Sequence, residues 1–189
     1  MFIQSEATPN PATLKFIPDK PVLLTGVLDY RSPDAAAASP LASRLFAIDG
    51  VDGVFLGQDF ISVTKADALA WQHLKPAVLG VIMEHYMSGA PVVVGADTSS
   101  AAADADAEDF SADDQEIVDT IKELIETRVR PAVANDGGDI VFRGFRQGVV
   151  TLHMRGACAG CPSSTATLRN GIENMLKHYV PEVTEVRPV

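Results

Sequence analysis

The stretch that decides the fold runs Val149-Val150-Thr151-Leu152-His153-Met154-Arg155-Gly156-Ala157-Cys158-Ala159-Gly160-Cys161-Pro162. Its first part alternates apolar and polar residues, which is typical of a half-buried strand. Behind it, apolar residues recur at the spacing of one helix face, at Leu168, Ile172, Met175, Leu176 and Tyr179. Pro162 suits a first helical turn, where its missing N–H has no partner to lose. We therefore predict that Cys158 and Cys161 lie on a tight loop between a strand and a helix.

This position predicts reactive sulfur atoms. A helix start presents unpaired N–H groups and the positive end of the helix dipole, and both stabilise a thiolate over a thiol. The residues around Cys158 and Cys161 are small, which should leave the sulfur atoms unobstructed, and Arg155 and Arg169 could add positive charge. We expect both cysteines to lose their protons more readily than an isolated cysteine does.

Four interpretations of the C-x-x-C spacing compete. Two packed structural cysteines are the least favoured, because nothing large and apolar surrounds them in the sequence. A redox dithiol fits the position between strand and helix, but a thioredoxin-like fold needs more chain after the motif than Pro162 to Val189 provides. Zinc in a closed structural site wants four ligands, and an iron–sulfur cluster is usually held by four thiolates. The spacing alone does not decide between zinc and a cluster.

For zinc and for a cluster alike, one chain supplies too few thiolate ligands, because it holds two cysteines in all. A symmetric dimer supplies four thiolates if a two-fold axis passes through the site. His153 lies five residues before Cys158 on the expected strand, and His178 lies at the far end of the expected helix. Neither is expected to complete a site within one chain.

Composition limits the class of protein. The chain has 189 residues, 47% of them hydrophobic, and a net charge of −10, which predicts one or two domains with a sizeable core and argues against nucleic-acid binding. No apolar run is long enough to span a bilayer, so no membrane partner is expected. The first fourteen residues contain no Lys or Arg, so we expect no signal or transit peptide. Two closely spaced cysteines point to a reducing compartment.

Residues 1–92 are predicted to form a small α+β domain. Strands are expected at residues 14–17, 22–28, 54–56 and 60–63, the last two as a hairpin. Ser39 and Pro40 fit the cap and first position of a helix that ends near Gly50. A second helix is expected from about Ala66 to Ser88, with a bend or new start near Lys75 because of Pro76. His73 and His85 lack a second ligand at a useful spacing, so we expect surface or packed histidines.

Residues 93–112 hold five acidic and no basic side chains among small residues, which is typical of a flexible linker. Residues 113–189 are predicted to form a second α+β domain in the order α-β-β-α-β. Ser111 is expected to cap its first helix, which should run to about Val129. Its strands should cover residues 140–145, 149–155 and 183–186, with Arg146-Gln147-Gly148 as the hairpin turn between the first two. Asp136-Gly137-Gly138-Asp139 is expected to be a turn rather than a cation site.

The whole sequence resembles the Nfu family of iron–sulfur proteins. Gly156-x-Cys158-x-x-Cys161-Pro162-Ser163-Ser164 looks like the NifU-type C-terminal signature, and Asp136-Gly137-Gly138-Asp139 and Asn170-Gly171-Ile172 resemble it further. The opening Met1-Phe2-Ile3-Gln4, Thr8-Pro9-Asn10-Pro11 and Leu14-Lys15-Phe16-Ile17-Pro18 look like the N-terminal domain of bacterial and mitochondrial members. The resemblance covers both expected domains and leaves out mainly the linker.

The resemblance implies a carrier rather than an enzyme. Such a protein receives an iron–sulfur cluster, usually 4Fe-4S though 2Fe-2S is possible, and passes it to apo-proteins. Cys158 and Cys161 fall on the family's cluster ligands, and a homodimer would share one cluster. The implied partners are apo-protein clients and upstream cluster donors, in a bacterial cytoplasm or, for a processed chain, the mitochondrial matrix. The alternatives are a dithiol oxidoreductase and a zinc-bridged interaction module that use the same cysteines.

Overall fold

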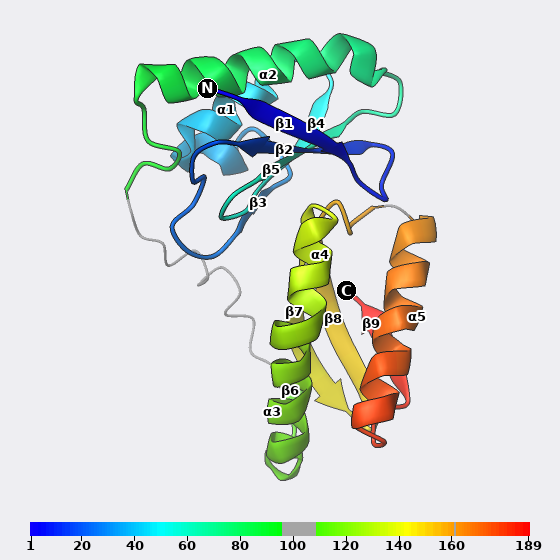
Figure 1. Ribbon diagram of the computed structural model, residues 1–189. Helices are drawn as coiled ribbons and strands as arrows, with labels where there is room; N and C mark the ends of the chain where they lie inside the picture. The colour runs from blue at the N-terminus through cyan, green and yellow to red at the C-terminus, as the bar shows by residue number, and fades with distance from the viewer. Residues whose placement is uncertain (96–108, 161) are drawn as a thin grey trace. The chain divides into compact units, whose positions relative to one another are not determined.

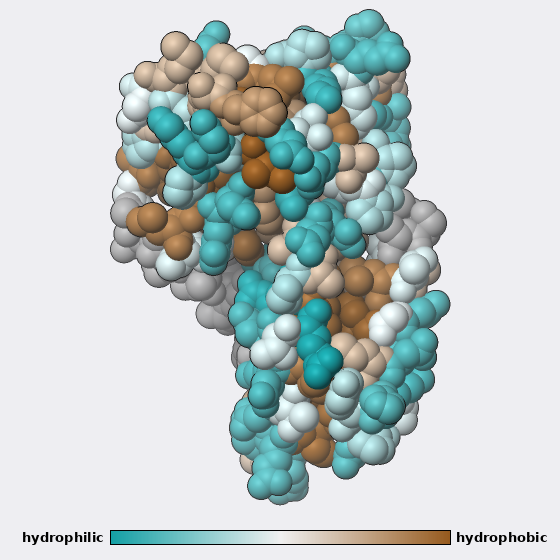
Figure 2. All heavy atoms as spheres, in the orientation of Figure 1, coloured by the Kyte–Doolittle hydropathy of each residue, from teal (hydrophilic) through white to brown (hydrophobic). Residues whose placement is uncertain are grey.

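The computed structural model describes residues 1–95, 109–160 and 162–189, and it divides the chain into two compact units, Met1–Ala101 and Ala102–Val189 (Figure 1). Each unit combines one β-sheet with helices, so the predicted class of two small α+β domains is confirmed. Most of the predicted linker, residues 93–112, lies outside the described residues. On the face that Figure 2 shows, hydrophilic residues cover most of the surface, with hydrophobic residues gathered in patches.

The first unit contains a five-stranded antiparallel sheet in the order β1-β2-β5-β4-β3. The strands are β1 (Ile3–Ala7), β2 (Thr13–Pro18), β3 (Leu28–Tyr30), β4 (Val51–Leu56) and β5 (Ile61–Lys65). A short 3-10 helix η1 (Ala35–Ala38) precedes α1 (Pro40–Phe46), and α2 (Trp71–Ser88) follows the sheet. Side chains of α1 and α2 share one buried cluster with residues from the strands, among them Leu41, Leu45, Val54, Val78 and Ile82.

Several predictions for the first unit are confirmed. Ser39 caps α1, because its hydroxyl accepts a hydrogen bond from the Ala42 N–H at 3.1 Å. The β4–β5 hairpin forms, although both strands extend beyond the predicted residues. The structure corrects two predictions. Residues 22–27 form no strand, and β3 begins only at Leu28. Helix α2 begins at Trp71 rather than near Ala66, and it continues through Pro76 without a new start.

The second unit contains a four-stranded sheet in the order β6-β7-β8-β9, with a parallel pair at each side of an antiparallel hairpin. The strands are β6 (Asp109–Phe110), β7 (Gly138–Arg146), β8 (Val149–Gly156) and β9 (Glu185–Pro188). The helices are the 3-10 turn η3 (Ala112–Asp114), α3 (Gln115–Leu124), the π-helical turn η4 (Ile125–Val129), α4 (Arg130–Asn135) and α5 (Pro162–Tyr179). In Figure 1 the helices lie on one side of this sheet.

The predicted order α-β-β-α-β is confirmed, with the short β6 added in front. The first helical segment is longer than predicted, because the chain passes through a π-helical turn and continues in α4 to Asn135. Pro131 does not end this segment, which continues to Asn135. The last strand begins at Glu185 rather than at Val183.

The β7–β8 hairpin closes at the predicted turn. Gln147 and Gly148 both have positive φ angles, 50° and 82°, as a tight turn between twisted strands requires. Leu152 and Met154 of β8 are buried in a cluster with residues from α3, α4 and α5. The hairpin therefore fixes β8, whose end leads directly into the cysteine loop. None of the helices in the described ranges combines the length and apolar character needed to cross a bilayer.

Candidate functional site

Cys158 lies where the sequence predicts it, between the end of β8 at Gly156 and the start of α5 at Pro162. Two backbone hydrogen bonds hold the loop: the Ala157 N–H donates to the Gly137 carbonyl and the Ala159 N–H to the Gly156 carbonyl, both at 3.2 Å. Cys161 lies outside the described residues, so its position beside Cys158 remains a prediction. The structure thus places one of the two predicted ligands.

The sulfur of Cys158 is not unobstructed, which corrects the expectation from the sequence. The residue is 6% exposed and belongs to the hydrophobic cluster of the second unit. The sequence suggested open surroundings because the neighbours along the chain are small. Cys158 instead joins a cluster whose other members come from elsewhere in the chain, including β7, α4 and α5.

Gly138 provides the space in which the Cys158 side chain lies. A Cβ atom added to Gly138 would lie 2.6 Å from the Cys158 Sγ and 2.6 Å from the Arg155 carbonyl oxygen. Glycine is therefore needed at these two adjacent positions for different reasons. Gly137 adopts a φ of 80° in the turn before β7, a conformation that side chains resist, whereas Gly138 lies at the start of β7 and allows close approach of the sulfur.

The pKa of Cys158 is raised, whereas the sequence predicts that it is lowered. Burial, followed by the negative charges of Asp136 and Asp139, raises the pKa of the thiol to about 12. Proximity to a helix start favours the thiolate, but removal of the sulfur from water and two carboxylates disfavour it more strongly. The expected readiness to lose a proton is therefore wrong for Cys158 in this conformation.

An ion pair between the buried Asp139 and the partly exposed Arg130 holds the start of β7, which lies beside Cys158. Asp139 is 4% exposed, and the Arg130 guanidinium donates to its carboxylate in two places, from Nε at 2.8 Å and from Nη2 at 3.1 Å. Arg130 also donates from Nη1 to Glu126 at 2.8 Å. The bidentate geometry links the first turn of α4 to the start of β7. The sequence does not reveal the ion pair between Arg130 and Asp139, because a pair nine residues apart across a turn leaves no periodic pattern.

Asp136 and Gly137 form the turn that the sequence predicts ahead of β7. Asp139 is engaged by Arg130, and the described residues contain no group of three or more His, Cys, Asp or Glu side chains that could hold a metal ion. His153 projects from β8 between the buried Leu152 and Met154, and therefore toward the sheet face opposite the core that contains Cys158. His178 packs against the Tyr179 ring near the end of α5.

The two histidines of the first unit lie at different depths on α2. His73 is exposed on α2. His85 is fully buried on the same helix, and neither of its ring nitrogen atoms has a hydrogen-bond partner among the residues that the structure describes. Burial, and then the charge of Arg44, lowers the pKa of His85. It is the packed histidine that the sequence predicts as one of two outcomes.

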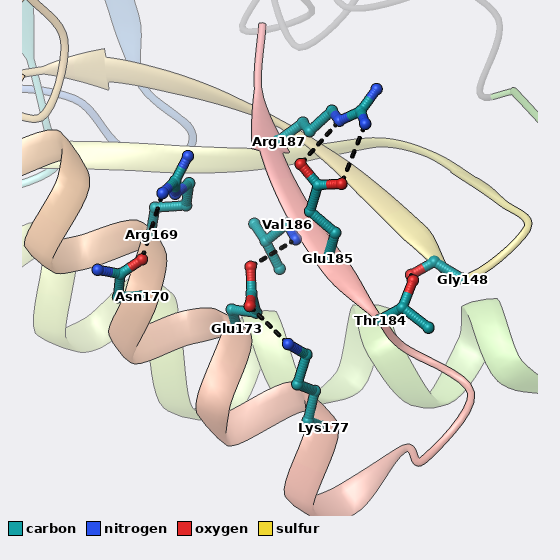
Figure 3. Close-up of polar contacts among 9 residues, drawn as sticks. All are labelled: Gly148, Arg169, Asn170, Glu173, Lys177, Thr184, Glu185, Val186 and Arg187. Carbon is teal, nitrogen blue, oxygen red and sulfur yellow. Dashed lines mark hydrogen bonds and ion pairs between the residues drawn. The ribbon is translucent and has the colours of Figure 1, made fainter.

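Helix α5, which begins beside the loop, is fixed to the sheet by a second set of polar contacts (Figure 3). The Glu173 carboxylate accepts a hydrogen bond from the Val186 N–H of β9 at 3.1 Å, and it pairs with Lys177 at 2.6 Å. Nearer the loop, the Thr165 hydroxyl donates to the Cys158 carbonyl oxygen at 3.1 Å. Arg169 lies beside Asn170 on α5, at 3.4 Å. The cysteine loop is thus held between two anchored elements, β7 and α5.

Comparison with known proteins assigns both units. Residues 3–89 match the family described as "Scaffold protein Nfu/NifU N terminal", and residues 121–187 match the "NifU-like domain". The chain is 50% identical over 190 residues to the human "NFU1 iron-sulfur cluster scaffold homolog, mitochondrial", covering 100% of this chain and 72% of the human protein. It is 52% identical over 188 residues to "NifU-like protein 4, mitochondrial" of Arabidopsis thaliana, covering 98% of this chain and 65% of the plant protein.

Among solved structures, the crystal structure of protein SAV1430 from Staphylococcus aureus is 27% identical, covers 43% of this chain and 99% of that chain, and has a TM-score of 0.40. The identity to the human and plant proteins extends over both units and includes the order in which they follow one another. The chain therefore belongs to the Nfu family, with an Nfu-type N-terminal domain followed by a NifU-like domain.

Proposed function

We propose that this protein is an iron–sulfur cluster carrier, and that Cys158 and Cys161 from each of two chains hold one 4Fe-4S cluster before its transfer to an apo-protein. The observation that carries the proposal is the position of Cys158 in a loop between β8 and α5, within a chain whose human relative is named an iron–sulfur cluster scaffold homolog. The cluster is cargo in this account, so the protein is not proposed to be an enzyme.

The donor set fits this cargo. Soft thiolates are the ligands that iron–sulfur clusters prefer, and the chain supplies two. Within the described ranges no cluster of other ligating side chains adds to them. Four thiolates therefore require a second copy, and a two-fold axis at the loop meets the requirement. Clients with stronger ligand sets can then take the cargo as the two copies separate.

Burial of Cys158 in this conformation protects its thiol. A thiol with a pKa near 12 is almost entirely protonated at neutral pH and reacts slowly. Loading must displace this proton, because thiolate is the form that binds metal. It must also expose the sulfur, so the loop has to move away from Gly138. We infer that the bonds between iron and the sulfur atoms offset the free-energy cost of deprotonating and exposing Cys158.

The raised pKa of Cys158 weighs against a dithiol oxidoreductase, whose attacking cysteine needs a lowered pKa. A zinc-bridged interaction module uses the same four sulfur atoms and remains the second candidate. The N-terminal domain, residues 1–92, is proposed to contact clients or donors, with residues 93–112 as a flexible linker between the domains. The names of the human and plant relatives both include mitochondria, which favours the mitochondrial matrix over a bacterial cytoplasm.

Anaerobic reconstitution tests the proposal. The reduced protein is incubated with iron and sulfide or with zinc, and bound metal, sulfide and absorption are measured. A cluster gives broad absorption near roughly 400 nm, which zinc does not. Cys158→Ser and Cys161→Ser should keep the fold and lose the cluster. Retention of a full cluster by either variant would refute the ligand assignment, and binding of zinc alone would favour the interaction module.

A further inference from the structure

Helix α2 has an exposed face that is mostly apolar, and we call it the outer face. It follows helical spacing along the side that points away from the core, and all its members are exposed: His73, Pro76, Ala77, Gly80, Met83, Glu84 and Met87. Met83 is 40% and Met87 77% exposed. The opposite side of the helix is buried through Leu74, Val78, Ile82 and His85. In Figure 1, α2 lies along the outside of its unit.

Such a face is unusual for a helix in contact with water. A surface helix normally carries charged and polar residues opposite its buried stripe, whereas a helix that is apolar on all sides is a buried one. Here the outer face has one acidic residue, Glu84, and one histidine, His73. Within the described parts of the chain, no side chain pairs with the Glu84 carboxylate or with the His73 ring. The outer face is therefore suited to cover by another surface.

The order of residue sizes along the outer face indicates what covers it. Its N-terminal half carries the small or compact residues Pro76 and Ala77, and its C-terminal half carries the long side chains Met83 and Met87. Gly80 lies at the middle of the eighteen-residue helix. A Cβ atom added to Gly80 would meet no atom within 4 Å, so the backbone is open to close approach at this point.

We propose that the outer face of α2 binds the outer face of α2 in a second copy of this chain, antiparallel, with the two-fold axis at Gly80. In this arrangement Met83 and Met87 of each copy lie over the Ala77 and Pro76 region of the other. The Glu84 carboxylate of one copy comes within a turn of the His73 ring of the other, and symmetry repeats this polar pair. A two-fold contact requires a surface to be its own complement, whereas an unrelated partner does not.

The contact is expected to be weak by itself. An eighteen-residue helix is about 27 Å long, and one face of it offers less area than the roughly 800 Å² per partner of a standard stable interface. It lies in the first unit, so it is separate from the cysteine loop. Its effect is to keep two chains together at high effective concentration. It goes beyond the proposed function, because it needs neither cysteine and no cluster.

Sedimentation velocity of the full-length protein tests the contact without a cluster. Both cysteines are replaced by serine, and the concentration is raised stepwise. We expect a reversible monomer–dimer equilibrium. Gly80→Glu should weaken it at least tenfold, although this substitution strengthens the helix itself. Met87→Glu should act in the same direction. Gln58→Glu, which adds the same charge at the exposed turn of the β4–β5 hairpin, should leave the equilibrium unchanged.

Cross-linking tests the position of the axis. In the same cysteine-free background, Gly80→Cys should form a disulfide-linked dimer on mild oxidation much faster than Gln58→Cys. A protein that stays monomeric at every concentration would overturn the proposal. A dimer that Gly80→Glu and Met87→Glu leave unchanged, or equal cross-linking at the two positions, would overturn it as well. None of these results depends on whether the protein carries a cluster.

Discussion

Gly138 at the start of β7 lies directly against the sulfur of Cys158, so close that a Cβ atom on Gly138 would be 2.6 Å from the Sγ. The same atom would be 2.6 Å from the backbone oxygen of Arg155. A backbone atom cannot step aside as a flexible side chain can. The absence of a side chain at residue 138 is therefore what allows the Cys158 side chain to be stored inside the domain.

The first prediction concerns Gly138→Ala. Overpacking of this kind typically costs about 1–3 kcal/mol, and here the strain falls on the cysteine loop, so we expect loss of stability together with poorer cluster loading. Urea unfolding and iron content after reconstitution measure the two effects. Gly171→Ala on α5 is the control: its Cβ would meet nothing within 4 Å, and removal of a helical glycine should stabilise by roughly 0.5–1 kcal/mol. Equal behaviour of the two variants would contradict the role of Gly138.

The second prediction concerns the pH dependence of Cys158 alkylation, measured in Cys161→Ser so that one thiol remains. With the pKa raised to about 12, the rate should be slow at pH 7 and should rise about tenfold per pH unit through pH 10 without a plateau. In urea, the same protein should level off near the ordinary thiol pKa of about 8.5. A plateau below pH 9 in the folded protein would show that the thiol is not buried as described.

The same shift has a consequence for stability. A thiol whose pKa is raised in the folded state contributes stability that is fully present below the pKa of the unfolded chain and is lost as the pH rises towards 12. We therefore expect the unfolding free energy to fall above about pH 9. The decrease should be smaller in Cys158→Ser, which has no thiol to ionise. Identical alkaline profiles for the two proteins would argue against a raised pKa.

The third prediction concerns the Arg130–Asp139 pair. Removal of Arg130 leaves a carboxylate that is 4% exposed without its bidentate partner. Because the Arg130 side chain is itself 33% exposed, the expected cost is about 1–3 kcal/mol, below that of a fully buried pair. Arg130→Ala should therefore be destabilised, and Arg130→Lys should recover only part of the loss, because an ammonium group cannot donate in the same fork. Urea unfolding gives both values.

A double substitution separates the pair from its members. In Arg130→Ala with Asp139→Ala, no buried charge is left unpaired, so the loss should be smaller than the sum of the two single losses. Additive losses would mean that the ion pair does not hold the start of β7 to α4. The exposed Arg187–Glu185 pair serves as the control, since exposed pairs contribute little and Arg187→Ala should have a minor effect.

The fourth prediction concerns Glu173, which joins α5 to β9. Its hydrogen bonds with Lys177 and the Val186 N–H lower the pKa of the carboxyl group. A lowered pKa contributes stability that is present above the pKa of the unfolded state and is lost as the pH falls through the folded value. Glu173→Gln should therefore be less stable than the parent at pH 7, and the difference should shrink below about pH 4. A difference in unfolding free energy that stays constant from pH 7 to below pH 4 would contradict the lowered pKa of Glu173.

The sequence predicts features whose causes are local. The Ser39 cap, the Gln147-Gly148 turn and the strand–loop–helix order around Cys158 each depend on neighbouring residues, and each forms as predicted. Residues 22–27 were misjudged because an apolar run can pack as a loop: the Val22 and Leu23 N–H groups both donate to the Gln58 carbonyl, outside any strand ladder.

The site itself could be predicted only in part. The position of the cysteines between a strand and a helix could be predicted, because their spacing and the flanking patterns are local features of the sequence. The burial of Cys158 and its raised pKa were not, because both arise from residues brought in by the fold: Gly138 in β7, and the carboxylates of Asp136 and Asp139. Loop residues that are small along the chain can still be covered by elements distant in sequence.

Native mass measurement of the reconstituted protein is the most direct test of the central claim. If one cluster is shared by two copies, the loaded species should have the mass of two chains plus one 4Fe-4S unit. Cys158→Ser and Cys161→Ser should each give unloaded protein. A loaded species with the mass of a single chain, and with all iron ligands supplied from within it, would contradict the account.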